Sequence, residues 1–309
     1  MLKRLNIYFK EMYPIIPRLG LGYLIAAEIY FIVLLNHGVV WADIMPHLGI
    51  QELILGFTVF SFLCWLRIAD DFKDYELDCR LFADRPLPSG RVTKKDLKIF
   101  LCILIPVTLA LNFFFMNNFL FCVILYTYGS LMAIWFFQKY KIQKSLPLAL
   151  VTHNPVQFIM NIYIISFTVI KYNSILPNKI PAVDLINAFA CFTLYFPALY
   201  WEVSRKIRAP KDETEYVTYS KLFGYKKATN FAMFVVLLDI MTNFVLVWNL
   251  NKISVALLAL LVGWMCWTFQ RFKSDPTRFK LVTKVERYTY LQELTMIATI
   301  VVFLIVGKI

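Results

Sequence analysis

The chain has 309 residues, of which 60% are hydrophobic and only 17% are charged, and its formal net charge is +12. Soluble globular domains are about half apolar, so this composition favours a polytopic membrane protein. A basic chain can also bind nucleic acid, but its cations must then gather on one soluble face. Here Lys and Arg recur in short groups between apolar runs, and we expect no nucleic-acid partner.

Apolar runs long enough to cross a bilayer follow one another along the whole chain. A membrane-spanning helix needs about 20 apolar residues. Nine runs meet this requirement, at residues 18–36, 49–68, 97–115, 119–137, 148–170, 183–203, 229–249, 252–270 and 289–307. The gaps between them leave no room for a soluble domain. The sequence therefore predicts an all-α fold, a bundle of nine transmembrane helices that forms a single domain over residues 1–309.

The cations test this segmentation and predict its orientation. If the nine runs cross alternately, 28 of the 32 Lys and Arg residues fall on the side of the N-terminus. The other side holds Lys171, Lys179, Lys252 and Lys308. Because cytoplasmic loops carry the excess of Lys and Arg, we expect a cytoplasmic N-terminus and a C-terminus outside.

An acidic segment follows the second apolar run and reads DDFKDYELDCRLFADRPLPSGR, residues 70–91. Asp70, Asp74 and Asp78 are four residues apart, so they share one face if the helix continues. Such carboxylates suit Mg²⁺, which is usually held by one or two carboxylates together with phosphate oxygens. We expect Asp70, Asp71, Asp74 and Asp78 to be metal ligands, with Arg67, Arg85 and Arg91 binding substrate phosphate. The alternative is a solvated acidic helix end that is balanced by the same cations.

This segment resembles the first signature of the UbiA superfamily of intramembrane prenyltransferases. Asp70 stands where the family usually has Asn, Asp74 and Asp78 occupy its aspartate positions, and the string RPLPSG is unbroken over residues 85–90. The resemblance implies a central cavity that is open to lipid. It also implies two cytoplasmic aspartate-rich segments that bind Mg²⁺ and an isoprenyl diphosphate.

The second signature departs from the family pattern. It is similar to Tyr200–Gly224, where TYSKLFG fits the expected ending. Glu202 replaces the first aspartate, but Lys206 stands four residues later in place of the second. Arg205, Lys206 and Arg208 could hold the diphosphate directly, or Glu202 and either Asp212 or Glu213 could complete a second ion site. A third interpretation is a basic loop that touches anionic lipid.

Polar residues inside the fifth run are further candidates. Asn154, Gln157 and Asn161 share a helix face, and such groups either line a cavity or hydrogen-bond between helices. We expect Asn154, Gln157 and Lys139 to bind substrate. Lys139 is alternatively a cation that anchors the chain at the membrane surface. His153 is either a general base or a packing residue, and Asp239 is an unexplained acid in the seventh run.

These observations predict an integral-membrane prenyltransferase. It would move an isoprenyl group from an isoprenyl diphosphate to an aromatic or lipidic acceptor, with Mg²⁺ as cofactor and membrane lipid around it. We expect Asp74, Asp78 and Glu202 to be catalytic. Two alternatives stay open. The same fold could transfer phosphoribosyl to polyprenyl phosphate or cyclise a terpene, or it could have become a non-catalytic lipid-binding or transport protein.

Overall fold

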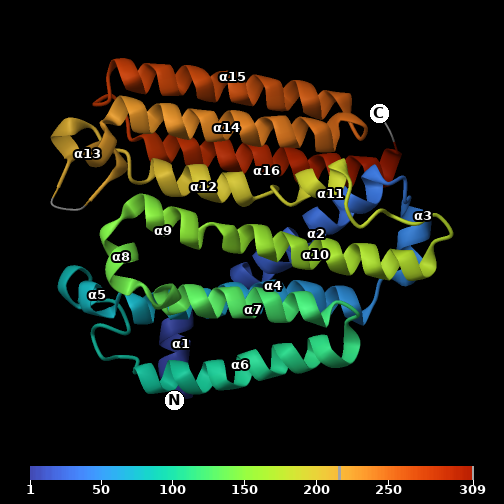
Figure 1. The fold of residues 1–309 in the computed structure, drawn as a ribbon, viewed down its shortest axis with the longest axis horizontal. Helices are drawn as coiled ribbons and strands as arrows, with labels where there is room; N and C mark the ends of the chain where they lie inside the picture. Colours follow the sequence, from blue (N-terminus) through green and yellow to red (C-terminus); the bar gives the residue numbers. More distant parts are fainter. Residues whose placement is uncertain (215–216, 308–309) are drawn as a thin grey trace. The chain divides into compact units, whose positions relative to one another are not determined.

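The computed structural model describes residues 1–214 and 217–307, and every regular element in these ranges is a helix. The chain forms two compact units, which are described separately. Unit 1 comprises Met1–Ala27, Met45–Lys139 and Ser166–Lys179, and unit 2 comprises Glu28–Ile44, Tyr140–Ile165 and Ile180–Ile309. Figure 1 labels the helices in chain order.

Unit 1 is built around α4 (Ile50–Lys73), which packs against α6 (Lys94–Phe115), α7 (Phe119–Ala133) and α5 (Tyr75–Leu81). The short α1 (Leu2–Glu11) crosses α6. A capping box starts α6: the Thr93 hydroxyl accepts from the Asp96 backbone N–H, and the Asp96 carboxylate accepts from that of Thr93. Arg4 of α1 donates two hydrogen bonds to the same carboxylate at 2.7 and 2.9 Å, so it ties α1 to the start of α6.

Unit 2 is centred on α14 (Tyr225–Trp248), which packs against α15 (Lys252–Ser274), α16 (Leu281–Val306) and α12 (Tyr195–Ser204). The shorter α11 (Leu185–Ala190) and α13 (Tyr219–Phe223) also contact α14. At one end of this unit, α12 and α15 end while α13, α14 and α16 begin (Figure 1). The other helices of the chain are α2 (Ile15–Asn36), α3 (Trp41–Ile44), α8 (Lys139–Lys144), α9 (Leu146–His153), α10 (Pro155–Ile175), and the 3₁₀ turns η1 (Met45–His47), η2 (Trp135–Phe137) and η3 (Pro210–Asp212).

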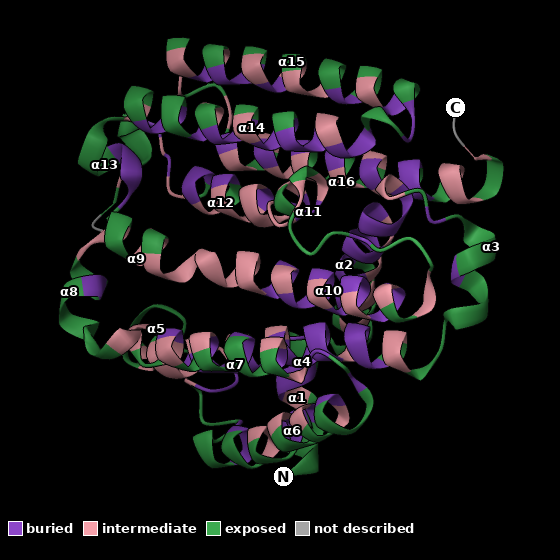
Figure 2. Ribbon diagram, turned by 45° about the vertical axis from the view of Figure 1, so that its right-hand side comes forward, coloured by how far each residue is buried: buried purple, intermediate pink, exposed green. Residues whose placement is uncertain are grey.

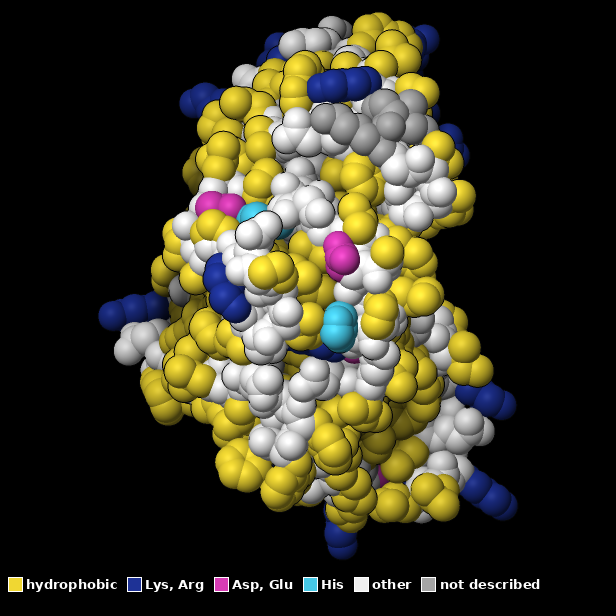
Figure 3. All heavy atoms as spheres, turned by 90° about the vertical axis from the view of Figure 1, so that its right-hand side faces the viewer, with side chains coloured by type: hydrophobic (Ala, Val, Ile, Leu, Met, Phe, Trp, Pro, Cys, Tyr) yellow, Lys and Arg dark blue, Asp and Glu magenta, His cyan; other side chains and the backbone are white. Residues whose placement is uncertain are grey.

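Seven helical stretches are long and apolar enough to cross a membrane. They are α2, α4, α6, α9 with α10, α14, α15 and α16, and they correspond to seven of the nine predicted runs. The outer sides of several remain apolar and uncovered: only 22% of the apolar window of α6 and 28% of that of α15 is buried (Figure 2). Hydrophobic side chains also predominate on the face drawn in Figure 3. Apolar surface of this extent requires lipid contact.

The other two predicted runs differ from a full span. Residues 119–137 give α7, which has 15 residues and stops where Trp135, Phe136 and Phe137 all adopt positive φ. Residues 183–203 give two short helices, because Leu194 adopts φ 59° and separates α11 from α12. A β-carbon disfavours this left-handed region, so tertiary contacts must hold both breaks, and hydropathy alone does not predict them. Lys308 lies outside the described residues.

Candidate active site

The acidic segment is not one continuous helix. α4 ends at Lys73, α5 begins at Tyr75, and Asp74 between them has φ −96° and ψ 7°. Helical backbone hydrogen bonds still cross this break, from the N–H of Asp74 to the carbonyl of Asp70 and from the N–H of Asp78 to the carbonyl of Asp74. The predicted four-residue spacing is therefore kept while the helix bends. Asp74 is exposed and Asp78 is buried, so the three aspartates do not form one uniformly open face.

Two of the four aspartates are buried and paired. Asp71 accepts a hydrogen bond from the buried Tyr8 hydroxyl at 2.5 Å and forms an ion pair with Arg67 at 2.9 Å. Asp78 accepts from Arg85 at 2.9 Å. The crevice that Asp71, Asp78, Tyr8 and Arg85 line is too tight for a water molecule. These contacts stabilise the fold at the end of α4, where burial without a partner would be costly.

The other two aspartates are open to solvent. Asp70 has a side chain that is 48% exposed and lies 3.4 Å from Lys73. Asp74 is exposed as well. Partial loss of hydration, followed by the charges of Asp70 and Asp78, raises the pKa of Asp74, while Lys73 lowers it. A carboxylate whose charge is disfavoured in this way gains most from a bound cation, so Asp70 and Asp74 are the accessible part of the acidic segment.

The turn RPLPSGR is anchored in the hydrophobic core of unit 1. Leu87 and Val92 pack in a buried cluster with residues of α1, α4 and α6, and Gly90 adopts φ 74°, which glycine accepts without strain. The turn positions Arg85 against Asp78. It directs Arg91 to α1, where the guanidinium donates to both carboxylate oxygens of Glu11 and to the carbonyl of Asp84. These contacts occupy Arg91, which we had expected to bind phosphate.

In unit 2, the second charged segment begins at the end of α12. Glu202 accepts from Arg205 Nε at 2.5 Å and forms an ion pair with Lys206 Nζ at 2.9 Å. Both cations therefore neutralise the carboxylate that we expected to hold an ion. Tyr219 of α13 lies near this group, and burial, then the charge of Glu202, raises the pKa of its hydroxyl.

The loop after α12 is held by its own side chains. Arg208 donates to the Thr214 hydroxyl at 2.9 Å, and its backbone N–H donates to the Ser220 hydroxyl at 2.9 Å. Glu213 accepts from the hydroxyls of Thr218 and Ser220. Asp212 is exposed. Glu213 is thus a structural anchor of the loop, while Asp212 remains open to solvent.

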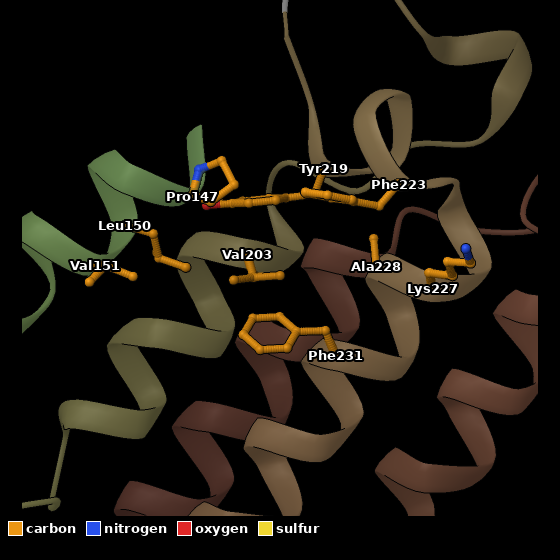
Figure 4. A pocket seen from close by; sticks show the side chains of 9 residues that line it. All are labelled: Pro147, Leu150, Val151, Val203, Tyr219, Phe223, Lys227, Ala228 and Phe231. Carbon is orange, nitrogen blue, oxygen red and sulfur yellow. The ribbon is translucent and has the colours of Figure 1, made fainter. Parts of the chain in front are cut away.

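An apolar cavity of about 370 Å³ lies beside this segment in unit 2 (Figure 4). Leu150 and Val151 of α9 form one side, and Val203 of α12 and Phe231 of α14 face them. The remaining lining residues are Pro147, Tyr219, Phe223, Lys227 and Ala228. Its volume and lining are typical of pockets for small apolar ligands.

The polar residues of the fifth run have different environments. Asn161 donates to the carbonyls of Cys191 and Thr193 at 2.8 and 2.5 Å, which lie at the break between α11 and α12. Gln157 donates to the Asn161 side chain at 3.1 Å. Asn161 therefore connects α10 to the break between α11 and α12, the alternative to cavity lining, whereas the Gln157 hydrogen bond lies within α10. Asn154 caps α9, and its buried side-chain nitrogen has no hydrogen-bond partner among the described residues.

His153 and Lys139 have less distinctive surroundings. His153 Nδ1 lies 3.0 Å from the Ala149 carbonyl one turn earlier, which is typical of a packing histidine. Lys139 is exposed at the start of α8.

Two features were missed in the sequence. Tyr8, which binds Asp71, lies 63 residues away in the chain, and no local pattern links the two. Glu28 of α2 is buried in unit 2, where it hydrogen-bonds to Glu293 of α16. Asp239 is also buried there and accepts from Gln292 at 2.7 Å. An acidic residue within an apolar run is the sequence signal for such a buried group. Glu28 and Glu293 carry this signal as Asp239 does.

Within residues 1–214 and 217–307, no three carboxylate, histidine or cysteine side chains lie close enough to hold a metal ion by themselves. The open carboxylates of Asp70 and Asp74 nevertheless have the oxygen donors that Mg²⁺ prefers, and phosphate oxygens and water usually complete its shell. The residues present therefore fit a metal that binds together with a phosphorylated ligand.

These observations define an all-helical, multi-pass integral membrane protein with an open aspartate pair at the end of one spanning helix. The sequence model of the UbiA prenyltransferase family matches residues 31–281, and the chain belongs to this family of membrane prenyltransferases. The resemblance seen in the sequence is thereby confirmed. No curated protein sequence matches the chain.

The chain is also similar to a solved structure that concerns digeranylgeranylglyceryl phosphate synthase in membranes. The alignment covers 98% of this chain and 100% of that chain, with 18% sequence identity and a TM-score of 0.60. At this identity the likeness shows the fold.

Proposed function

We propose that this prenyltransferase transfers an isoprenyl group from an isoprenyl diphosphate to a hydrophobic acceptor, with Mg²⁺ as cofactor. The observation that carries the proposal is the open pair Asp70 and Asp74 at the end of α4. Cations border this pair, since Lys73 contacts Asp70 and Arg67 and Arg85 bind the adjacent buried aspartates. Carboxylates beside cations form the mixed environment that a metal–diphosphate ligand requires.

The chain's own residues have three tasks in this reaction. Asp70 and Asp74 would hold Mg²⁺ together with the diphosphate. Asp71 and Asp78 stabilise the end of α4 from which these two carboxylates project. Arg67 pairs with Asp71 through Nη2, and its side chain is 34% exposed, so a guanidinium with five N–H donors can also donate to a phosphate oxygen. As the carbon–oxygen bond of the substrate breaks, negative charge grows on the diphosphate, and preorganised cations stabilise it. Bound Mg²⁺ would add Lewis-acid stabilisation of the same leaving group.

The second charged segment supplies further cations. Arg205, Lys206 and Arg208 are candidates for binding phosphate directly, and their number supports this over a second metal held by Glu202 and Asp212. Glu202 is already paired with two of these cations, Arg205 and Lys206. The apolar cavity in Figure 4 supports a hydrocarbon chain as part of a substrate.

We also propose nine membrane passages, in which α7 and the broken pair α11 and α12 complete the seven long spans. The whole chain would act as one domain with a lipid-accessible cavity, a cytoplasmic N-terminus and a C-terminus outside. The distribution of Lys and Arg supports this orientation. The neighbouring fold described for digeranylgeranylglyceryl phosphate synthase supports a lipidic rather than a soluble acceptor.

The test is turnover by the purified protein in liposomes. Pyrophosphate release from farnesyl or geranylgeranyl diphosphate is measured with Mg²⁺ and with a lipid extract as the source of acceptor, and mass spectrometry separates a transferred from a cyclised product. Asp74→Asn should reduce turnover more than about 100-fold, since it removes an ionised ligand of the transition state. Glu76→Gln is the matched control, because Glu76 is exposed on the adjoining α5. Full activity of Asp74→Asn would refute the proposal.

A further inference from the structure

A second cavity in unit 2, of about 400 Å³, is lined by cations from two separate connections of the chain. Arg205 and Arg208 come from the segment after α12, and Lys280 comes from the connection between α15 and α16. No motif in the sequence marks Lys280. In Figure 1 the end of α12 lies at the same end of unit 2 as this connection.

The cavity combines a charged rim with an apolar floor. Arg205 has a side chain that is 47% exposed, and Lys280 is exposed. Ile207, Phe272 and Leu281, which also line the cavity, are buried. A site of this kind suits an amphiphile, whose polar group meets the cations while its apolar part contacts the floor.

The charge of the lining matches a doubly charged anion. Three cations and one acid, Asp212, line the cavity. Arg205 also pairs with Glu202, but Lys206 balances that carboxylate, so the net charge is about +2, close to the −1.5 to −2 of a phosphate monoester at neutral pH. Arg205 donates a side-chain hydrogen bond to Glu202, and Arg208 donates one to Thr214. Because a guanidinium has five N–H donors, both retain donors for phosphate oxygens.

The start of α16 adds to this positive potential. Leu281 and Val282, its first two residues, line the cavity, and within the described part of the chain its N-cap Lys280 makes no side-chain capping hydrogen bond. The unpaired backbone N–H groups and the dipole of a 26-residue helix favour an anion at this end.

We propose that this cavity binds the phosphate monoester group of an amphiphile, with Arg205, Arg208 and Lys280 as its ligands. This deepens the proposed function, on which it rests in taking Arg205 and Arg208 as phosphate-binding residues. It assigns the role of Asp212 differently: the carboxylate limits the net charge of the cavity and does not hold a metal ion. A free energy of about 1.4 kcal/mol for a partly solvated charge-assisted contact corresponds to a tenfold change in Kd.

The experiment measures binding to the full-length protein in detergent micelles by native mass spectrometry. The probes are oleoyl lysophosphatidic acid, which carries a phosphate monoester, and monooleoylglycerol, which has the same chain and no charge. The wild-type protein should bind the phosphate probe at least tenfold more tightly. Lys280→Ala should weaken that binding about tenfold, Lys280→Arg should restore it, and Asp212→Asn should tighten it.

The matched control is Arg278→Ala, since Arg278 is an exposed cation of the same connection that lines a different cavity. It should change the Kd less than twofold. Equal effects of Lys280→Ala and Arg278→Ala, equal affinity for the two probes, or weaker binding by Asp212→Asn would each overturn the proposal. The assay needs no turnover. If Asp74→Asn abolishes prenyl transfer while Lys280→Ala binds normally, this inference fails and the proposed function stands.

Discussion

Replacement of Arg85 by Ala tests whether the RPLPSGR turn serves the fold or only the ligand. In the structure Arg85 Nη1 lies 2.9 Å from Asp78 Oδ2, with side-chain exposures of 35% and 10%. Removal of one partner from a fully buried ion pair costs about 3–5 kcal/mol, because the other charge stays buried and unpaired. Since a third of Arg85 is open to water, we expect a smaller loss of about 2 kcal/mol from the free energy of unfolding.

The assay is a double-mutant cycle by chemical or thermal unfolding in detergent, without ligand. Asp78→Asn removes the charge that Arg85 neutralises, so Arg85→Ala should cost much less in that background. Lys95→Ala is a suitable control, because Lys95 is an exposed cation in the first turn of α6. If Arg85→Ala leaves the unfolding free energy unchanged and alters only substrate affinity, the structural role assigned to the pair is wrong.

Three further changes have clear expected outcomes. Lys73→Met removes the charge that lowers the pKa of Asp74, so the Asp74 carboxyl should ionise at a higher pH. As the pH is lowered, kcat/KM should therefore begin to fall at a higher pH than in the wild type. An unchanged pH profile would exclude ionised Asp74 as the required form. Asn161→Leu leaves two backbone carbonyls without their donor and should lower thermal stability by about 2 kcal/mol, whereas Gln157→Leu, which keeps those bonds, should cost less; equal losses would contradict this account. Arg91→Ala should change KM for the isoprenyl diphosphate less than twofold, because Arg91 contacts Glu11 in the structure, and a tenfold rise would restore it as a phosphate ligand.

The architecture was largely predictable because the bilayer imposes a length and a polarity on each helix. Hydropathy located all seven long spans, and the repeated DxxxD spacing with RPLPSG indicated the family. The two interrupted runs were not predictable in the same way. Leu194 and Trp135–Phe137 adopt left-handed φ although none of them is glycine. At Leu194, the neighbouring carbonyls of Cys191 and Thr193 are held by Asn161, about 30 residues earlier in the chain.

The sequence predicts which residues form the candidate site, but it does not predict which aspartates are buried and paired and which are open to solvent. Four aspartates within nine residues look equivalent in the sequence, and all four were expected to bind metal. Their difference arises from Tyr8, Arg67 and Arg85, which pair with the buried members of the set. Such pairing depends on how α1 and the RPLPSGR turn pack against α4, and spacing along one helix does not contain that information.

The anchoring of α12 has a mechanical consequence. The helix begins next to Thr193, whose carbonyl is held by Asn161 of α10, and the Glu202–Arg208 segment follows at its other end. Ten residues of α-helix are about 15 Å long, so a tilt of about 5° around the anchored end displaces the far end by about 1 Å. A movement of α10 at Asn161 would therefore shift the cations of the second segment at the far end of α12.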